Sequence, residues 1–139
     1  MFAVTFITQV LNGLQLGSIY ALVALGYTMV YGIILLLNFA HGDIIMVGAY
    51  ISWLVMSKLG LNPAIAVVLS IAGCMLLGVL IDKVAYAPLR DAPRLSILIT
   101  AIGVSYFLEN GSQLLFGADA KVVPAYTSVS NIQVGDLTL

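Results

Sequence analysis

The residues best suited to chemistry lie in the stretch LNFAHGDIIM, residues 37–46. An amide, an imidazole and a carboxylate occur within six residues there, at Asn38, His41 and Asp43, inside a long apolar run. One imidazole and one carboxylate are too few ligands for a metal site, so we predict none. The same groups suit the lining of a path for a polar solute. We therefore take Asn38, His41, Gly42 and Asp43 as candidate substrate-path residues.

The composition is that of a membrane protein. Of the 139 residues, 62% are hydrophobic and 8% are charged, whereas a soluble domain has about 45–50% apolar and about 25% charged residues. The net charge of −1 and the lack of a basic face argue against nucleic-acid binding. The lone Cys74 excludes an intrachain disulfide. We find no nucleophile–base pair, phosphate loop or zinc spacing, and so predict neither catalysis nor a cofactor on this chain.

The apolar residues form four segments, which predict an all-α, polytopic transmembrane helical bundle. The predicted spans are residues 2–37, 43–57, 63–81 and 95–116, in a domain of residues 1–117 that is followed by a polar segment, 118–139. A helix needs about 20 residues to cross about 30 Å of hydrocarbon. The first segment would reach ~54 Å, so it must tilt, protrude or break, and the second would reach only ~22 Å.

These lengths indicate a broken or re-entrant region near residues 38–43. If Ser57 reaches one membrane surface, the short second helix begins inside the hydrocarbon at Asp43. Irregular backbone at that depth survives only where protein buries it or where it lines a wet cavity. Asp43 would then lie in the first helical turn, where free N–H groups favour a carboxylate. The alternative is that NFAHG forms a plain turn among headgroups and water.

The positive charges predict the orientation of the bundle. Lys83, Arg90 and Arg94 are three of the five cations, and all lie in the predicted loop 82–94. By the positive-inside rule this loop is cytoplasmic. The N-terminus and residues 117–139 are then predicted to lie outside.

Two sets of small residues recur every four positions and predict close helix packing. The sets are Gly13, Gly17 and Ala21, and Ser70, Cys74 and Gly78. Small side chains on one helical face let two backbones approach closely. A role in lining the substrate path is the alternative.

Glu109 is a second ionisable group within the apolar segments. Such groups are costly in lipid and usually face a partner or a cavity. Glu109 lies in the outer third of the last segment, so solvation from the membrane surface explains it equally well.

Four sequence blocks together resemble a known family. They are NGLQLGSIYALVALGYTMVYGI (12–33), NFAHGDIIMVGAY (38–50), VAYAPLR (84–90) and ITAIGVSYFLENGSQLLFG (99–117). In this order and spacing they resemble the permease of the branched-chain amino-acid ABC importers, those for leucine, isoleucine and valine. Of the two permease types in such importers, the chain is more similar to the N-terminal half of the H-type subunit.

This resemblance implies a role in a larger complex. It implies a multi-pass subunit of the bacterial inner membrane, embedded in lipid, that pairs with a second permease subunit. Two cytoplasmic ATPase subunits would hold ATP and magnesium, and a periplasmic amino-acid-binding protein would deliver the small-molecule substrate. Many relatives carry Gln where this chain has Glu109, which weakens any special role for its charge.

Other functions fit the residues as well. Related permeases are associated with urea, amides or aromatic breakdown products. A re-entrant-loop channel would use NFAHG as a pore constriction and would need no ATPase. A non-transporting membrane subunit would have NFAHG as an interfacial turn with no polar cavity beside it.

Overall fold

The computed structural model describes residues 1–125, 133–134 and 137–138. Its α-helices are α1 (Phe2–Ile34), α2 (His41–Trp53), α3 (Pro63–Ile81) and α4 (Arg94–Phe116). Two π-helical turns and one 3₁₀ turn extend them: η1 (Leu54–Lys58), η2 (Asp82–Tyr86) and η3 (Ala87–Leu89). Two short antiparallel strands follow, β1 (Gln133–Val134) and β2 (Leu137–Thr138). The predicted all-α membrane fold is thus confirmed, with this small strand pair added.

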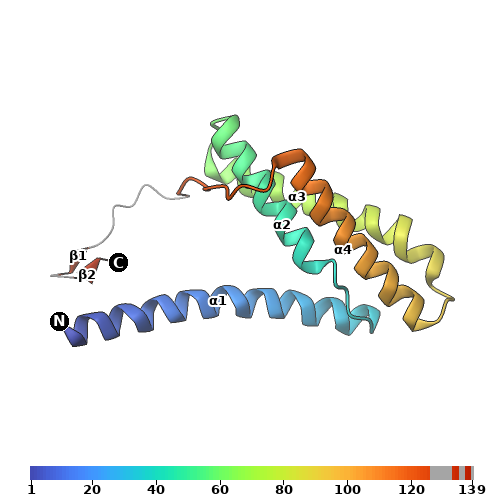
Figure 1. Cartoon of the computed structure of the whole chain (residues 1–139), viewed down its shortest axis with the longest axis horizontal. Coiled ribbons are helices and arrows are strands. Elements are labelled where there is room, and N and C mark those ends of the chain that lie inside the picture. Colours follow the sequence, from blue (N-terminus) through green and yellow to red (C-terminus); the bar gives the residue numbers. More distant parts are fainter. Residues whose placement is uncertain (126–132, 135–136, 139) are drawn as a thin grey trace.

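Helices α2, α3 and α4 pack together, whereas α1 runs away from them (Figure 1). Only the C-terminal part of α1 approaches the other helices. The half-covered residues in that part are Val23, Gly26, Tyr27 and Val30, which share one helical face. The 33 residues of α1 would span ~50 Å, more than the hydrocarbon thickness of a membrane.

Local sequence signals explain where α3 and α4 begin and end. The Asn62 side chain accepts a hydrogen bond from the Ala64 N–H at 2.9 Å, and Pro63 occupies the first turn of α3. This is the expected arrangement at a helix start, because the cap satisfies a free N–H and proline has none to satisfy. Pro93 precedes α4, and Gly117 ends it with φ of 81°, a conformation that favours glycine.

The predicted loop 82–94 is shorter in the structure. Helical turns continue from α3 through η2 and η3 as far as Leu89. Pro88 does not break them, because it lies in the first turn of η3, where its missing N–H has no role. The connection to α4 is therefore only residues 90–93.

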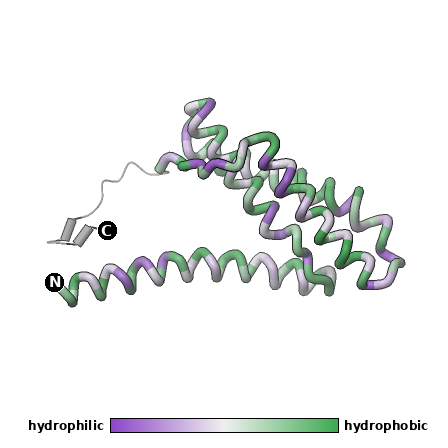
Figure 2. Tube along the Cα trace, viewed as in Figure 1, coloured by the Kyte–Doolittle hydropathy of each residue, from purple (hydrophilic) through white to green (hydrophobic). Residues whose placement is uncertain are grey.

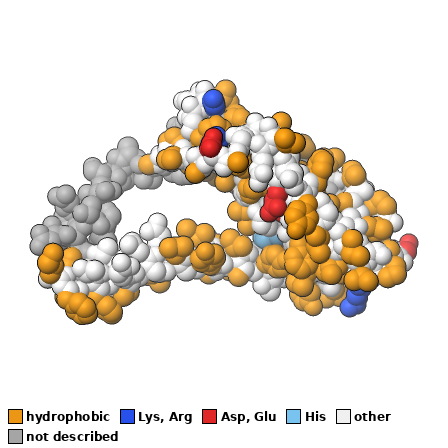
Figure 3. Space-filling model, viewed as in Figure 1, with side chains coloured by type: hydrophobic (Ala, Val, Ile, Leu, Met, Phe, Trp, Pro, Cys, Tyr) orange, Lys and Arg blue, Asp and Glu red, His pale blue; other side chains and the backbone are white. Residues whose placement is uncertain are grey.

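The surface of the molecule is largely apolar. Figure 2 shows hydrophobic residues along most of each helix, and Figure 3 shows few charged side chains on the visible face. In the described part of the chain, two helical stretches are long and apolar enough to cross a membrane, Phe2–Ile33 and Pro63–Leu89. Helix α2 alone has only 13 residues. Helices that are apolar all round belong in lipid or in a large core, and here the buried core is small.

Candidate functional site

The helix break between α1 and α2 covers residues 35–40. Leu35 ends α1 in a left-handed conformation with φ of 56°, and its N–H donates to the Tyr31 carbonyl at 2.8 Å. The Asn38 side-chain oxygen accepts from the Ala40 N–H at 3.1 Å, an Asx turn that leads into α2. The break thus starts three residues before the predicted 38–43, and His41 begins the new helix.

Asn38 is tied to the end of the α3 extension. The Tyr86 hydroxyl donates a hydrogen bond of 2.7 Å to the Asn38 side-chain oxygen. That oxygen therefore accepts from both Tyr86 and Ala40. The bond to Tyr86 holds the Asn38 side chain against η2, and the bond to Ala40 holds it against the start of α2.

Asp43 is buried in the first turn of α2, with 8% of its surface exposed. The Ser105 hydroxyl on α4 donates a hydrogen bond to its carboxylate oxygen Oδ2. A carboxylate also gains from the helix N-terminus, where the dipole and the free N–H groups are positive. Buried charge in an apolar bundle is costly, so its placement here marks a candidate functional group.

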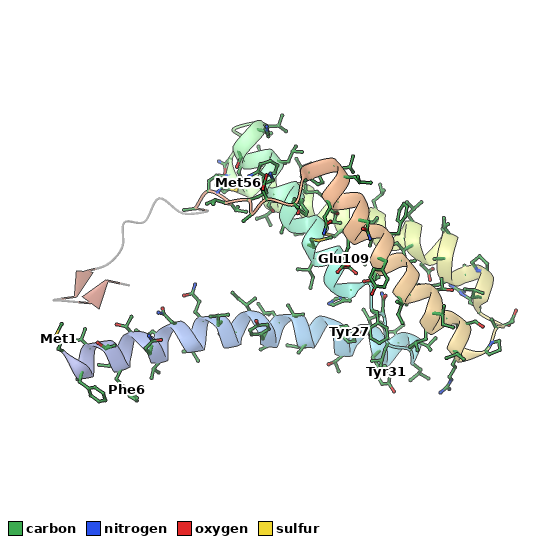
Figure 4. All side chains as sticks on the ribbon, in the orientation of Figure 1. Met1, Phe6, Tyr27, Tyr31, Met56 and Glu109 are labelled. Carbon is green, nitrogen blue, oxygen red and sulfur yellow. The ribbon has the colours of Figure 1, made fainter. Side chains whose placement is uncertain are left out.

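His41 lies against α1, and Gly42 faces open space. The His41 ring packs edge-on against Tyr27, with the ring centroids 5.4 Å apart and an interplanar angle of 88°. A Cβ at Gly26 would lie 3.0 Å from His41 Nε2, so the imidazole packs closely against this glycine and would have to shift slightly to admit a side chain there. Figure 4 shows Tyr27 on the part of α1 that approaches the other helices. Apart from the adjoining residues and the nearby backbone of α2, no atom of the described residues lies within 4 Å of a Cβ built at Gly42.

We call Asn38, His41, Asp43, Tyr86 and Ser105 the helix-break cluster. Its contacts link the break to η2 and α2 to α4, and the His41 ring contacts Tyr27 on α1. The sequence prediction named the first three residues and did not name Tyr86 or Ser105. Their hydrogen bonds join residues that are 48 and 62 positions apart in the sequence, and no local sequence pattern predicts such a contact.

A cavity of about 470 Å³ opens beside the cluster. Asn38 and Tyr86 form part of its wall, together with the charged side chains of Asp82 and Arg90. The rest of the wall is apolar and comes from Ile33, Leu36, Leu37, Ile97 and Ala101. Small-molecule sites combine mostly apolar walls with a few polar groups in this way.

The second set of small residues lies partly at a helix contact. Ser70 on α3 is hydrogen-bonded to Ser52 at 2.7 Å and donates to the Gly48 carbonyl at 3.1 Å. The Cys74 thiol donates to the Ile44 carbonyl at 3.4 Å. Ser70 and Cys74 therefore face α2, whereas a Cβ built at Gly78 would meet no other side chain or helix within 4 Å among the described residues.

The first set of small residues meets nothing in the described chain. Gly13, Gly17 and Ala21 are all exposed, and no atom lies within 4 Å of a Cβ built at either glycine. Packing on this face stays a prediction.

The charged candidates outside the helix break lie at the surface. Lys83, Arg90 and Arg94 are exposed, and Arg90 forms an ion pair of 3.5 Å with Asp82. Glu109 is exposed on α4 (Figure 4). Within the described residues, no group of three or more His, Cys, Asp or Glu side chains is arranged to hold a metal.

An aromatic cluster lies at the other end of α2. Tyr50 stacks on Phe116 with the centroids 4.6 Å apart, and Trp53 meets Phe116 edge-on at 6.5 Å. The ammonium groups of Lys58 and Lys121 lie 5.9 and 5.4 Å from the Trp53 ring. Tryptophan, tyrosine and lysine are typical of a membrane–water interface.

Comparison with known families decides the class of protein. The family described as branched-chain amino acid transport system / permease component matches residues 9–134. The chain belongs to this family. The description of this family, a permease component of a transport system, agrees with the family resemblance predicted from the sequence.

Curated relatives agree with this family assignment. The chain is 42% identical over 128 residues to the high-affinity branched-chain amino acid transport system permease protein LivH of Salmonella typhimurium and of Escherichia coli K12. It is 42% identical over 127 residues to the corresponding permease protein BraD of Pseudomonas aeruginosa. Each match covers 86% of this chain and 41–42% of the relative's length. No solved structure matches the chain.

Proposed function

We propose that this chain forms part of a permease subunit that imports leucine, isoleucine and valine across the bacterial inner membrane. The observation that carries the proposal is the helix-break cluster, polar side chains gathered beside a cavity in a chain that is otherwise apolar. The names of the relatives, high-affinity branched-chain amino acid transport permeases, supply the substrate class.

The aromatic cluster supports a position of Asp43 inside the membrane. Trp53 follows Asp43 by ten residues on one helix, a rise of ~15 Å. With Trp53 at one interface of a ~30 Å hydrocarbon layer, Asp43 comes near the middle. The break then belongs to the discontinuous helices that transporters use around their substrates.

The chemistry of the cluster suits a zwitterion with an aliphatic side chain. The carboxylate of Asp43 accepts one side-chain hydrogen bond, from Ser105, and an ionised carboxylate has room for several. Asn38, Gly42 and the N-terminus of α2 offer further polar contacts to the solute. The apolar wall of the cavity suits the branched side chain.

In this proposal, energy comes from other chains. Two cytoplasmic ATPase subunits bind ATP and magnesium, a second permease completes the passage, and a periplasmic protein delivers the amino acid. The segment 82–94 faces the cytoplasm, and residues 117–139 face the periplasm. ATP binding and hydrolysis on the partner subunits bias helix rearrangement between two access states.

Leucine uptake tests the proposal. We expect Asp43→Asn and Asn38→Leu in the full-length permease to lower uptake of labelled leucine at least tenfold, because the first replaces the buried carboxylate by a neutral amide and the second removes the amide of the cluster. Glu109→Gln is the matched control, since it removes an exposed carboxylate outside the cluster. Copurification of the ATPase subunits checks assembly. Normal uptake by both cluster variants would exclude these residues from the path.

A further inference from the structure

We propose that the cavity beside the break is a binding site for a zwitterionic amino acid, with Arg90 binding its carboxylate and Asp82 its ammonium group. This site rests on the proposed transport function and adds a substrate contact outside the helix-break cluster. It lies between the break, η2 and α4. In the proposed orientation, it is the last place that the amino acid occupies before the cytoplasm.

The apolar half of the cavity suits the side chain of the ligand. Ile33, Leu36 and Leu37 line it from the end of α1 and the break, and Ile97 lines it from α4. The volume of about 470 Å³ is within the range of about 300–1,000 Å³ that small-molecule sites have. A branched aliphatic group would remove apolar wall from water, which is the favourable part of binding.

The polar half carries one group of each sign. Arg90 Nη2 and Asp82 Oδ2 are 3.5 Å apart, longer than the ~2.7–2.9 Å of a strong charge-assisted hydrogen bond. Arg90 is 71% exposed and Asp82 is 46% exposed at the side chain. A guanidinium has five N–H donors and a carboxylate has two oxygens, so this single contact leaves most of both groups available.

Structural stabilisation does not account for this pair. Exposed ion pairs contribute about 0–1 kcal/mol, because water screens them and ordering two side chains costs entropy. The pair also stands at the edge of a cavity rather than on a flat surface. Opposite charges that flank an apolar pocket match the two ends and the side chain of an amino acid.

The cavity also adjoins the helix-break cluster. Asn38 and Tyr86 form part of its wall, and the Tyr86 hydroxyl donates a hydrogen bond to the Asn38 side-chain oxygen there. In this proposal, an amino acid that leaves the cluster enters this cavity next. Urea and simple amides lack both charges, so the site favours amino acids over these solutes.

Binding of three matched ligands to the full-length permease complex tests the site. The ligands are leucine, leucinamide, which lacks the carboxylate, and 4-methyl-2-oxopentanoate, which lacks the ammonium group. We expect Arg90→Gln to weaken binding of leucine about tenfold and to leave leucinamide binding unchanged. Asp82→Asn should weaken leucine binding by a similar factor and leave binding of the oxo acid unchanged. Arg90→Lys should retain the preference for leucine over leucinamide.

Neighbouring charges provide the controls. Lys83→Gln and Asp91→Asn change exposed residues beside the pair that do not line the cavity, and should leave all three affinities unchanged. The readout is a ratio of affinities within each variant, so a smaller folded fraction does not alter it. Unchanged ratios in both pair variants, or no leucine binding by a wild-type complex that transports leucine, would overturn the site. Absence of ATP-driven leucine uptake by the wild-type complex would instead overturn the proposed function.

Discussion

The two sets of small residues have the same spacing but different surroundings. On α3, Ser70 and Cys74 face α2 and hydrogen-bond to its atoms, and a Cβ at Gly48 would lie only 2.8 Å from the Cys74 sulfur. On α1, a Cβ built at Gly13 or Gly17 meets no other side chain or helix within 4 Å in the described part of the chain. Small residues spaced by four therefore predict that a helix allows close packing on that face. The spacing does not predict which other helix packs there.

The two sets of small residues differ in whether polar atoms form hydrogen bonds to another helix. In lipid there is little hydrophobic drive between helices, so close packing and interhelical hydrogen bonds hold them together. The α2–α3 contact has both, through Ser52, Ser70 and the Gly48 carbonyl. The exposed set on α1 has only small side chains. We expect substitutions to separate the two sets.

Enlarging Gly48 should have the largest effect. In Gly48→Val the new side chain meets the Cys74 sulfur, and overpacking of this kind costs about 1–3 kcal/mol. Gly17→Val is the matched control and should change the free energy of unfolding by no more than ~0.5 kcal/mol. Thermal unfolding in detergent measures both variants. Equal losses would show that the two glycines have similar surroundings, contrary to the structure.

Removing the serine contact should have an intermediate effect. A double-mutant cycle of Ser52→Ala and Ser70→Ala isolates the energy of their hydrogen bond. We expect a coupling of about 0.6 kcal/mol, the average for such bonds between membrane helices. A cycle of Ser18→Ala with Ser70→Ala, whose hydroxyls do not meet, should give no coupling. A coupling of zero for the first pair would argue against this helix contact.

A methyl group at Gly26 should have the smallest effect. The Gly26→Ala side chain would lie 3.0 Å from His41 Nε2, and moving the ring off its rotamer costs on the order of 0.5 kcal/mol. Gly32 is on the same helix, and a Cβ there has no close neighbour among the described residues. Gly32→Ala should therefore not incur this cost. Unfolding temperatures of the two variants provide the comparison. A less stable Gly32→Ala would contradict the contact between α1 and His41.

Sequence reasoning predicted the all-α membrane fold and a break after the first helix. Both follow from length, because 36 apolar residues exceed one crossing and the next segment falls short of one. The exact start of the break was missed. Leu35 takes a left-handed conformation that non-glycine residues rarely adopt, so a leucine at this position does not predict the end of the helix.

The candidate site was only partly predictable, for the same physical reason. Asn38, His41 and Asp43 stand out because they are polar in an apolar run. Tyr86 and Ser105 lie far along the chain, and only the packing of η2 and α4 brings their hydroxyls to the break. The separation of α1 from the bundle is likewise a matter of packing, since α1 and α3 are both long apolar helices without a charged side chain.

Water access to the start of α2 tests most directly whether the break lines a passage. Gly42→Cys and Gly78→Cys, each in a Cys74→Ser background, introduce thiols at two helical glycines that both have open space. We expect a hydrophilic maleimide to label Gly42→Cys quickly in the assembled full-length permease, leucine to slow that labelling, and Gly78→Cys to react slowly throughout. Equally slow labelling of both, or fast labelling of Gly42→Cys that leucine does not change, would contradict an aqueous substrate passage at the break.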